Sequence, residues 1–423
     1  MVLLYQFCYP AEFSFQGQLS YENHSYLSDL KEPTRAYDHI FHLAPELEVS
    51  GQKDRLVFKS HFRGNLSTEI TEEQSFHNIQ EAYWEYKNYP LRFRAGVDTY
   101  NWGTVDGYSP LDVANSKAFF NPLAAEKLGS PGLNLQLSWD SWRFEIFYIH
   151  QQRDSILPSA DSRWLPREFL SNVSAAEATI LLPSQFNYQY QSIIQLDNAL
   201  KNNFGFRLGG RFSDFDFGLI HIDGMSVTPH LRLEITTSGT PISLDPLILQ
   251  ATSDVLLTPV FFRQRTTGFH GAWAPGSIIF KLEAAYTDVL TKQNDIPNWA
   301  IQYVAGIEKP ISFFNKSLTF LFQYYHGKSD DLSENLISAG NRIFDNSALL
   351  ALLLSLNSSS SLRVSALEDF NNDSGFYNLT LNVSLGSGWD VRFAVDVLEG
   401  KEDSLLGSYR SNDRFQTQLG FRW

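Results

Sequence analysis

The chain has 423 residues, a formal net charge of -14, and a composition that is 14% aromatic but only 19% charged. No run approaches the ~18 apolar residues of a membrane-spanning helix, and the acidic balance argues against a nucleic-acid partner. A single cysteine leaves no disulfide within this chain. The aromatic and acidic composition fits a transmembrane β-barrel, in which one residue in two faces lipid, but it would also fit a large soluble all-β protein.

Residues 1–11 have the character of a signal peptide or of the remnant of one. Leu3, Leu4 and Phe7 form a short apolar core, although a basic segment before it is missing. We therefore expect residues 12–423 to form the folded unit.

From residue 12 to the end of the chain, apolar and polar residues alternate with period two in segment after segment. In the first segment Phe13, Phe15 and Leu19 alternate with Ser14 and Gln16. This pattern predicts β-strands that each have one apolar and one polar face.

The connections between these segments alternate in length, and this is the strongest signal in the sequence. The short connections are residues 51–54, 88–90, 140–141, 213, 274–276, 309–315, 357–360 and 386–388. The long connections are residues 25–40, 65–75, 100–131, 151–203, 223–259, 288–299, 327–345, 369–374 and 399–413. Tight turns at one end and long loops at the other are typical of a membrane barrel with periplasmic turns and external loops.

The fold class that follows is all-β: a single transmembrane antiparallel up-and-down β-barrel. Residues 229–237 also resemble a strand, but a membrane crossing there would break the up-down parity, so we place them in an external loop. The count is then about 18 strands, within a range of about 16 to 18, which is even as a single-chain barrel requires. A barrel of that size leaves a water-filled lumen.

Charged side chains concentrate on the polar faces between residues 59 and 265. The basic residues assigned to the lumen include Arg263 and Arg265. The pore-lining candidates are Lys59, Arg63, Arg92, Arg94, Asp98, Arg143, Glu145, Arg207 and Arg211. Two interpretations stay open: a transverse field that tunes ion selectivity, or charge pairs across strands that keep the lumen wet.

The loop at residues 100–131 holds the most distinctive motif, NWGTVDGYSPLDVANS, and its candidate constriction residues are Trp102, Asp106, Asp112 and Asn115. The motif resembles a W-G-x-x-D-x-x-x-P-x-D-x-x-N pattern in families of uncharacterised, porin-like proteobacterial outer-membrane barrels. This chain continues with Ser116 where those families continue with proline. The resemblance implies a barrel but specifies no substrate. We expect the loop either to fold inward and narrow the pore or to form a self-capped plug.

The loop at residues 151–203 is the longest, and residues 170–183 within it could form a short helix. Residues 244–260 form a second apolar piece outside the expected membrane band. These pieces could cover the pore, bind a ligand or meet a partner, and the sequence does not choose among these roles.

Catalytic and metal-binding motifs are missing from the sequence. It contains no G-x-S-x-G, H-E-x-x-H or P-loop pattern, and His61, on the predicted lumen side, has no obvious partner. We therefore expect no enzymatic activity, no cofactor and no metal.

The last ten residues form an amphipathic strand that ends on an aromatic side chain. Phe415, Thr417, Leu419, Phe421 and Trp423 share one face. The stretch resembles the closing strand of bacterial outer-membrane β-barrels, whose terminal aromatic residue is read by the barrel assembly machinery. The resemblance implies a location in the bacterial outer membrane and a terminal assembly signal, for which the candidates are Phe421 and Trp423.

The functional hypothesis is a porin-like channel for passive transport of small hydrophilic solutes or ions. The alternative is a non-conducting outer-membrane barrel that acts as an adhesin, a receptor or a structural partner through its external loops. A membrane-embedded hydrolase and a soluble all-β protein are the remaining options. Porin-like barrels are often trimers, but nothing in the sequence marks a trimer face, so the oligomeric state stays open.

Overall fold

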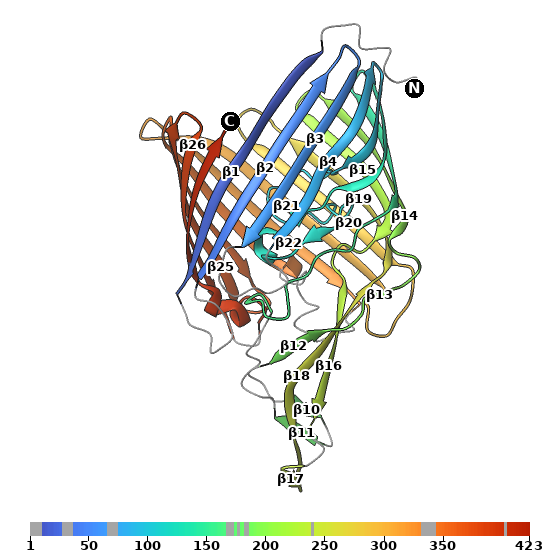
Figure 1. Cartoon of the computed structure of the whole chain (residues 1–423), viewed down its shortest axis with the longest axis vertical. Helices are drawn as coiled ribbons and strands as arrows, with labels where there is room; N and C mark the ends of the chain where they lie inside the picture. Colours follow the sequence, from blue (N-terminus) through green and yellow to red (C-terminus); the bar gives the residue numbers. More distant parts are fainter. Residues whose placement is uncertain are drawn as a thin grey trace.

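The computed structural model describes residues 11–27, 37–65, 75–165, 173–175, 178–181, 186–237, 241–330, 344–401 and 404–423. Within these ranges, one 18-stranded antiparallel sheet curls into a closed barrel (Figure 1). Its strands are β1 (Glu12–Tyr26), β2 (Tyr37–Ser50), β3 (Asp54–Asn65), β4 (Ser75–Asn88), β5 (Leu91–Asp98), β8 (Ser130–Trp139), β9 (Trp142–Gln151), β14 (Lys201–Phe212), β15 (Phe215–Met225), β19 (Arg263–Trp273), β20 (Ile279–Val289), β21 (Trp299–Phe313), β22 (Lys316–Ser329), β23 (Asn346–Asn357), β24 (Ser360–Asp369), β25 (Ser374–Gly386), β26 (Trp389–Glu399) and β27 (Arg414–Arg422). The predicted barrel and its strand number are confirmed.

The barrel closes between its first and last strands. β1 pairs antiparallel with β27, in a register that runs from Gln18 opposite Arg422 to Tyr26 opposite Arg414. Beyond the last paired residue, the Trp423 N–H donates to the Gly17 carbonyl at 3.2 Å. Closure pairs the edge strands with each other, so their backbone groups find partners without water.

The two faces of the barrel strands differ as the alternation predicts. Phe206, Phe393 and Leu419 point outward and are 40%, 40% and 44% exposed. Polar side chains of the opposite parity, such as Glu283 and Gln323, point inward and are buried. An apolar surface facing outward suits hydrocarbon, so the soluble all-β alternative is wrong.

The connections separate by length onto the two ends of the barrel. Two-residue turns such as 89–90 and 387–388 lie at one end, and the loops at 99–129 and 152–200 begin at the other. The left-handed φ of Asp140 and of Ser213 suits these tight turns. No helix within the described ranges is long and apolar enough to cross a membrane.

A second sheet extends beyond the long-loop end of the barrel (Figure 1). We call it the external sheet, and its long central strand is β18 (Leu247–Phe261). The other strands of the external sheet are β10 (Val173–Ala175), β11 (Ala178–Leu181), β12 (Asn187–Tyr190), β13 (Ile194–Gln195), β16 (His230–Thr237) and β17 (Ser243–Leu244). The placement of residues 229–237 outside the barrel is therefore confirmed.

The helix expected within residues 170–183 is wrong. The described parts of that segment, β10 and β11, are strands, and β11 runs parallel to β18 with Thr179 opposite Ile248. β18 offers free backbone groups at this point, and β-branched residues such as Thr179 and Ile180 fit a strand better than a helix. The expected signal peptide lies outside the described residues, apart from Ala11, and stays a prediction.

Candidate functional site: the lumen and its inward loop

The loop between β5 and β8, residues 99–129, folds into the barrel and reaches β20, β21 and β22, which lie five to seven strands from β8 along the barrel. We call it the inward loop. It carries a short hairpin of β6 (Lys117–Ala118) and β7 (Glu126–Lys127), with a 3-10 turn, η1 (Pro122–Ala124), between them. Its first half meets inward-facing side chains of β20, β21 and β22.

Glu283 on β20 is the main acceptor for the inward loop. Its buried carboxylate accepts hydrogen bonds from the Val105 N–H at 3.0 Å and from the Ser109 hydroxyl at 2.5 Å. The Thr104 N–H and hydroxyl donate to the same carboxylate. Backbone donors that would otherwise be stranded away from water are satisfied by one side chain, which fixes this turn of the loop.

The tip of the inward loop is held by a second group of polar contacts. Lys281 donates to Asp106 at 2.5 Å and to Glu308 at 2.8 Å. The Gly107 N–H donates to the side-chain carbonyl of Gln323 at 3.1 Å, and the amide of Gln323 donates to Asp106 at 3.2 Å. The tip is thus tied to β20 and β22 together.

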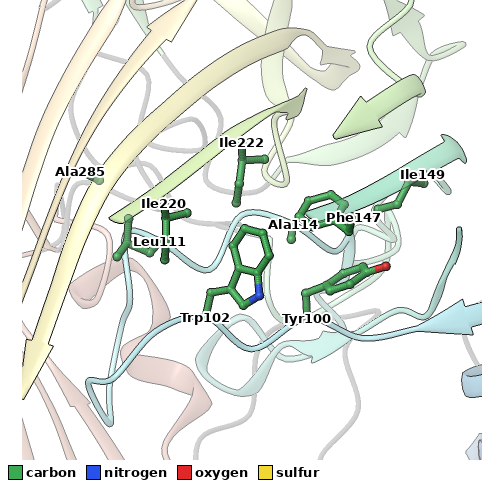
Figure 2. Packing of buried hydrophobic residues seen from close by; sticks show 9 residues of the cluster. All are labelled: Tyr100, Trp102, Leu111, Ala114, Phe147, Ile149, Ile220, Ile222 and Ala285. Carbon is green, nitrogen blue, oxygen red and sulfur yellow. The ribbon is translucent and has the colours of Figure 1, made fainter. Parts of the chain in front are cut away.

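The root of the inward loop packs against the inner wall through apolar side chains (Figure 2). Tyr100 and Trp102 stand beside Phe147 of β9, with ring centroids 4.4 Å and 5.0 Å from that of Phe147. Leu111 belongs to the same cluster and packs where Ile220 of β15 faces inward. This apolar patch on the inner wall is explained by the loop that covers it.

Two further candidates stabilise the inward loop internally. The Asn115 amide donates to the carbonyls of Asp98 and Leu128 at 3.2 Å and 3.0 Å, and its oxygen accepts from the Tyr100 N–H at 2.7 Å. Asn115 therefore joins the two ends of the loop. Asp112 pairs with Lys117 at 3.0 Å and with Lys127 at 2.5 Å.

The hairpin of the inward loop is attached to the wall by a histidine that sequence reasoning left without a partner. His61 of β3 is hydrogen bonded to Glu126 at 2.8 Å, and Asn78 of β4 donates to the same carboxylate at 2.9 Å. On its other side His61 stacks on His42 and is hydrogen bonded to it at 2.9 Å. The expectation that His61 lacks a partner is wrong, because the partner lies 65 residues away in the chain.

Most of the predicted pore-lining cations pair with carboxylates on neighbouring strands. Arg92 and Arg94 both donate to Glu85, at 2.6 Å and 2.7 Å. The remaining contacts of the candidates are Arg94 with Asp98 at 2.8 Å, Lys59 with Glu46 at 3.0 Å, Arg211 with Asp216 at 2.8 Å, Glu145 with Asn134 at 2.8 Å, and Arg63 over the Phe120 ring at 4.9 Å.

Arg143 and Arg207 differ from these paired cations. Arg207 lies opposite Glu145 of β9 in the register, and Arg143 lies opposite Gly209 of β14. The Nε atom of Arg207 is buried without a hydrogen-bond acceptor among the described residues. Positive charge on this wall is therefore less compensated than around Glu85.

Arg263 and Arg265 do not face the lumen, and that part of the prediction is wrong. They share the parity of Trp273 on β19, whose side chain is exposed on the outer face. Both arginines pair with Asp223 of β15 near the long-loop end of the barrel. Charges on the outer face are tolerated there because the strand has passed the apolar band.

Loop residues near Arg163 and the turn that ends at Asn412 meet at the long-loop end of the barrel, which was not predicted. We call this group the cover. The Arg163 guanidinium donates to the side-chain oxygen of Asn412 at 3.1 Å, and Asn412 donates to the Arg163 carbonyl at 2.9 Å. Asn412 ends the 3-10 turn η3 (Gly407–Asn412). Trp164 and Tyr409 join an apolar cluster that includes Tyr108 of the inward loop, so the cover and the loop are in contact.

The described residues contain no group of three or more histidine, cysteine, aspartate or glutamate side chains placed to hold a metal ion. The anchors that sequence reasoning missed are Glu283, Gln323 and Arg163. The inward parity of Glu283, which it shares with Lys281 on the same strand, was a signal, but its partners could not be read from the sequence because Ser109 is 174 residues away.

An 18-stranded, closed, up-and-down barrel with an apolar outer face is the transmembrane barrel of a bacterial outer membrane. No protein-family model and no curated protein matches the chain. Solved structures with similarity include an engineered mutant of the Rh. blastica porin (12% identity, TM-score 0.42, covering 97% of this chain and 100% of that one). Others are Salmonella typhi OmpF in complex with daunomycin (11%, 0.45, 97% and 97%) and a loop L8 deletion mutant of OmpT, an outer membrane protein of Vibrio cholerae (12%, 0.41, 98% and 99%). At these values the likeness is distant, and the assignment of the class stands on the barrel itself.

Proposed function

We propose that the protein is a porin-like channel for passive transport of small hydrophilic solutes or ions. The observation that carries the proposal is the anchoring of the inward loop within the lumen by Glu283 of β20, five strands along the barrel from β8. A barrel of about 18 strands encloses more space than its own side chains fill, so a loop fixed across the lumen acts as a constriction. Charged side chains along the remaining path would then set ion preference.

The direct test is planar-bilayer recording of the purified protein. We expect discrete conductance steps in ~1 M KCl, because charged and polar groups line the path. Repeated insertions without any steps would remove the channel proposal.

The contribution of the lumen wall is tested by reversing two charges. The double variant Arg92→Glu with Arg94→Glu should move the reversal potential in a KCl gradient towards cation selectivity, because Glu85 then also loses two of its three cations and keeps only Arg55. Lys401→Glu is the control, since Lys401 lies outside the barrel strands and pairs with Asp373. A reversal potential equal to that of the wild type would mean that permeating ions do not pass Arg92 and Arg94.

The second candidate is a non-conducting barrel that acts as an adhesin, a receptor or a structural partner. The external sheet supports it, because seven strands outside the barrel exceed what closing a loop requires. This candidate predicts no conductance steps, together with loss of surface adherence by expressing cells when residues 173–190 are removed. Conductance steps that persist in the deleted protein would favour the channel.

Three finer proposals concern relatives and partners. The motif from Trp102 to Asn115 supports a place among proteobacterial outer-membrane barrels. The aromatic end of β27 supports Phe421 and Trp423 as the signal that the barrel assembly machinery reads. Light scattering of the detergent-solubilised protein would decide between a monomer and the trimer that is common among porin-like barrels.

A further inference from the structure

The outer face of the barrel carries charged side chains at the external ends of β15, β19 and β20. We call this group the rim patch, and it consists of Asp223, Arg263, Arg265, Asp288 and Lys292. In the strand register Arg265 lies opposite Asp223 on one side and opposite Asp288 on the other. Three cations therefore stand beside two carboxylates, on a chain whose net charge is -14.

The rim patch sits directly beyond the apolar band of the same strands. On β20 the outward side chains Phe280, Leu282 and Tyr286 are all exposed. Tyr286 lies opposite Thr267, and the next outward step pairs Asp288 with Arg265. Tyrosine commonly marks the boundary between hydrocarbon and headgroups, which places Arg265 at the depth of the headgroups.

The two arginines of the rim patch have different hydrogen-bond status. Each of the three guanidinium nitrogens of Arg263 donates: Nε to Asp223, and the two terminal nitrogens to the carbonyls of Lys201 and Asn202 at 2.7 Å and 2.9 Å. Arg265 uses only its Nε, which donates to Asp223 at 2.9 Å. Its side chain is 53% exposed, and its two terminal nitrogens have no acceptor among the described residues.

We propose that the rim patch binds the phosphate of an anionic lipid headgroup in the outer leaflet. The buried Asp223 fixes the direction of Arg265, and Arg263 compensates the charge of Asp223, so the free edge of Arg265 faces the headgroup layer. A planar guanidinium with two free donors matches phosphate oxygens. Lys292, half-exposed beside Asp288, adds a third positive charge to the patch.

A lipid fits the rim patch better than a protein partner does. Below the patch, past His221, Thr267 and Tyr286, the outward side chains of the same strands are exposed and apolar, such as Leu219 and Leu282, and these suit acyl chains. At the same end of another wall, the outward pair Glu368 and Tyr377 presents a carboxylate and a phenol in place of a guanidinium. The charge of the rim therefore differs between these two walls.

The test is native mass spectrometry of the full-length protein in detergent. Dioleoylphosphatidylglycerol and dioleoylphosphatidylcholine are added in separate runs, since they have the same acyl chains and differ in headgroup charge. We expect the wild type to retain more of the anionic lipid. Arg265→Gln should reduce that retention about fivefold, the effect of about one basic side chain near an anionic surface.

The control variant is Arg232→Gln. Arg232 also pairs with a carboxylate, Asp295, but it lies on the external sheet and away from the apolar band. It should leave lipid retention unchanged. Equal retention of both lipids by the wild type would overturn the proposal, as would equal losses in the two variants. An Arg265→Gln protein that keeps its lipid but loses an oligomer would instead assign the patch to a protein interface. Heat-modifiable migration in gels verifies that each variant is folded.

Discussion

Glu283 is a single carboxylate on which the position of the inward loop depends. It is buried on β20 and accepts from three residues of the loop, Thr104, Val105 and Ser109. Hydrogen bonds to a charged acceptor contribute about 1.5–3 kcal/mol each, more than bonds between neutral groups. The loop is therefore held by chemistry at one residue as well as by packing.

We predict that Glu283→Gln loosens the inward loop. The glutamine amide would place an N–H group against loop donors that need an acceptor. The loss of these hydrogen bonds should lower the free energy of unfolding by about 3 kcal/mol. In bilayers the variant should show larger and noisier conductance steps. Glu46→Gln is the matched control, because Glu46 also faces the lumen and its contacts, Lys59 and Gln16, lie on barrel strands and not on the inward loop. Steps of wild-type size and noise would show that Glu283 does not hold the constriction.

Gly96 of β5 lies where the inward loop leaves the barrel and combines two constraints. Its φ is +137°, and a Cβ at this position would lie 2.2 Å from the Ala82 carbonyl oxygen. Backbone cannot move aside as a flexible side chain can. Gly276, in a short turn, also has a positive φ, of +79°, but a Cβ there would meet nothing within 4 Å.

The two glycines give a paired prediction. Gly276→Ala should cost about 1 kcal/mol, from the left-handed conformation alone. Gly96→Ala should cost about 3 kcal/mol or more, since strain and a backbone clash add. Urea unfolding of the detergent-folded proteins, followed by tryptophan fluorescence, measures both values. Equal losses would mean that the approach to Ala82 is not tight in solution.

Among elements, the barrel strands could be predicted from the sequence and the contacts of the long loops could not. A period of two marks strands whose faces meet lipid and water, as with Phe204 and Phe206 against Arg207 on β14, whereas residues 348–354 of β23 are apolar on both faces. The short turns could also be predicted from the sequence, as at Asp140 and Ser213. These signals are local, which is why they are readable.

The site was less predictable for physical reasons that differ from case to case. Trp102 and Asn115 were singled out by their motif, but the motif does not reveal that Phe147 and Asp98 receive them. Arg265 was misassigned because a charge indicates water without saying whether that water is inside the barrel or above the lipid. β10 and β11 form strands because β18 pairs with β11, and such tertiary context overrides a helix propensity.

Two titratable groups at the external sheet, His230 and Asp295, should respond to acid. His230 and Arg232 of β16 both contact Asp295, at 3.4 Å and 2.5 Å. Burial lowers the pKa of His230 below its ordinary value. The Arg232 guanidinium lowers the pKa of the Asp295 carboxyl. Both groups thus bind protons less readily in the folded sheet than when it is detached.

We predict that acidification loosens β16. When folded pKa values are depressed, the detached state binds more protons, so stability is present at neutral pH and is lost as pH falls. The first loss should begin near pH 6.5, the ordinary value for histidine, and the second below pH ~4, as Asp295 protonates. Hydrogen exchange of residues 230–234, corrected for intrinsic rates, measures this. His230→Gln should abolish only the first step; an unchanged profile in that variant would contradict the assignment.

At the scale of the whole molecule, closure is the condition that the other features require. In lipid, the backbone N–H and C=O groups of an open edge strand would have no water to bond. The pairing of β1 with β27 gives these groups their partners. The end of the chain takes part in this seam. The Trp423 ring covers Gly17, where a Cβ would lie 2.4 Å from the ring, and Phe421 packs on Trp389 at 4.8 Å between centroids.

The seam gives a prediction that separates structural from recognition roles of the terminal aromatics. Phe421→Ala with Trp423→Ala removes two outward side chains but leaves the backbone pairs between β1 and β27 in place. The purified double variant should still fold in detergent micelles. Its free energy of unfolding should fall by only about 2–4 kcal/mol, because both rings face lipid or detergent in the folded state. In cells it should accumulate outside the membrane, because it lacks the signal that we propose for the assembly machinery. The control Phe313→Ala with Phe314→Ala removes two exposed aromatics at the turn between β21 and β22, away from the seam. If the terminal variant fails to fold in micelles while the control folds, the aromatic end serves closure itself; if both variants reach the membrane, neither role holds.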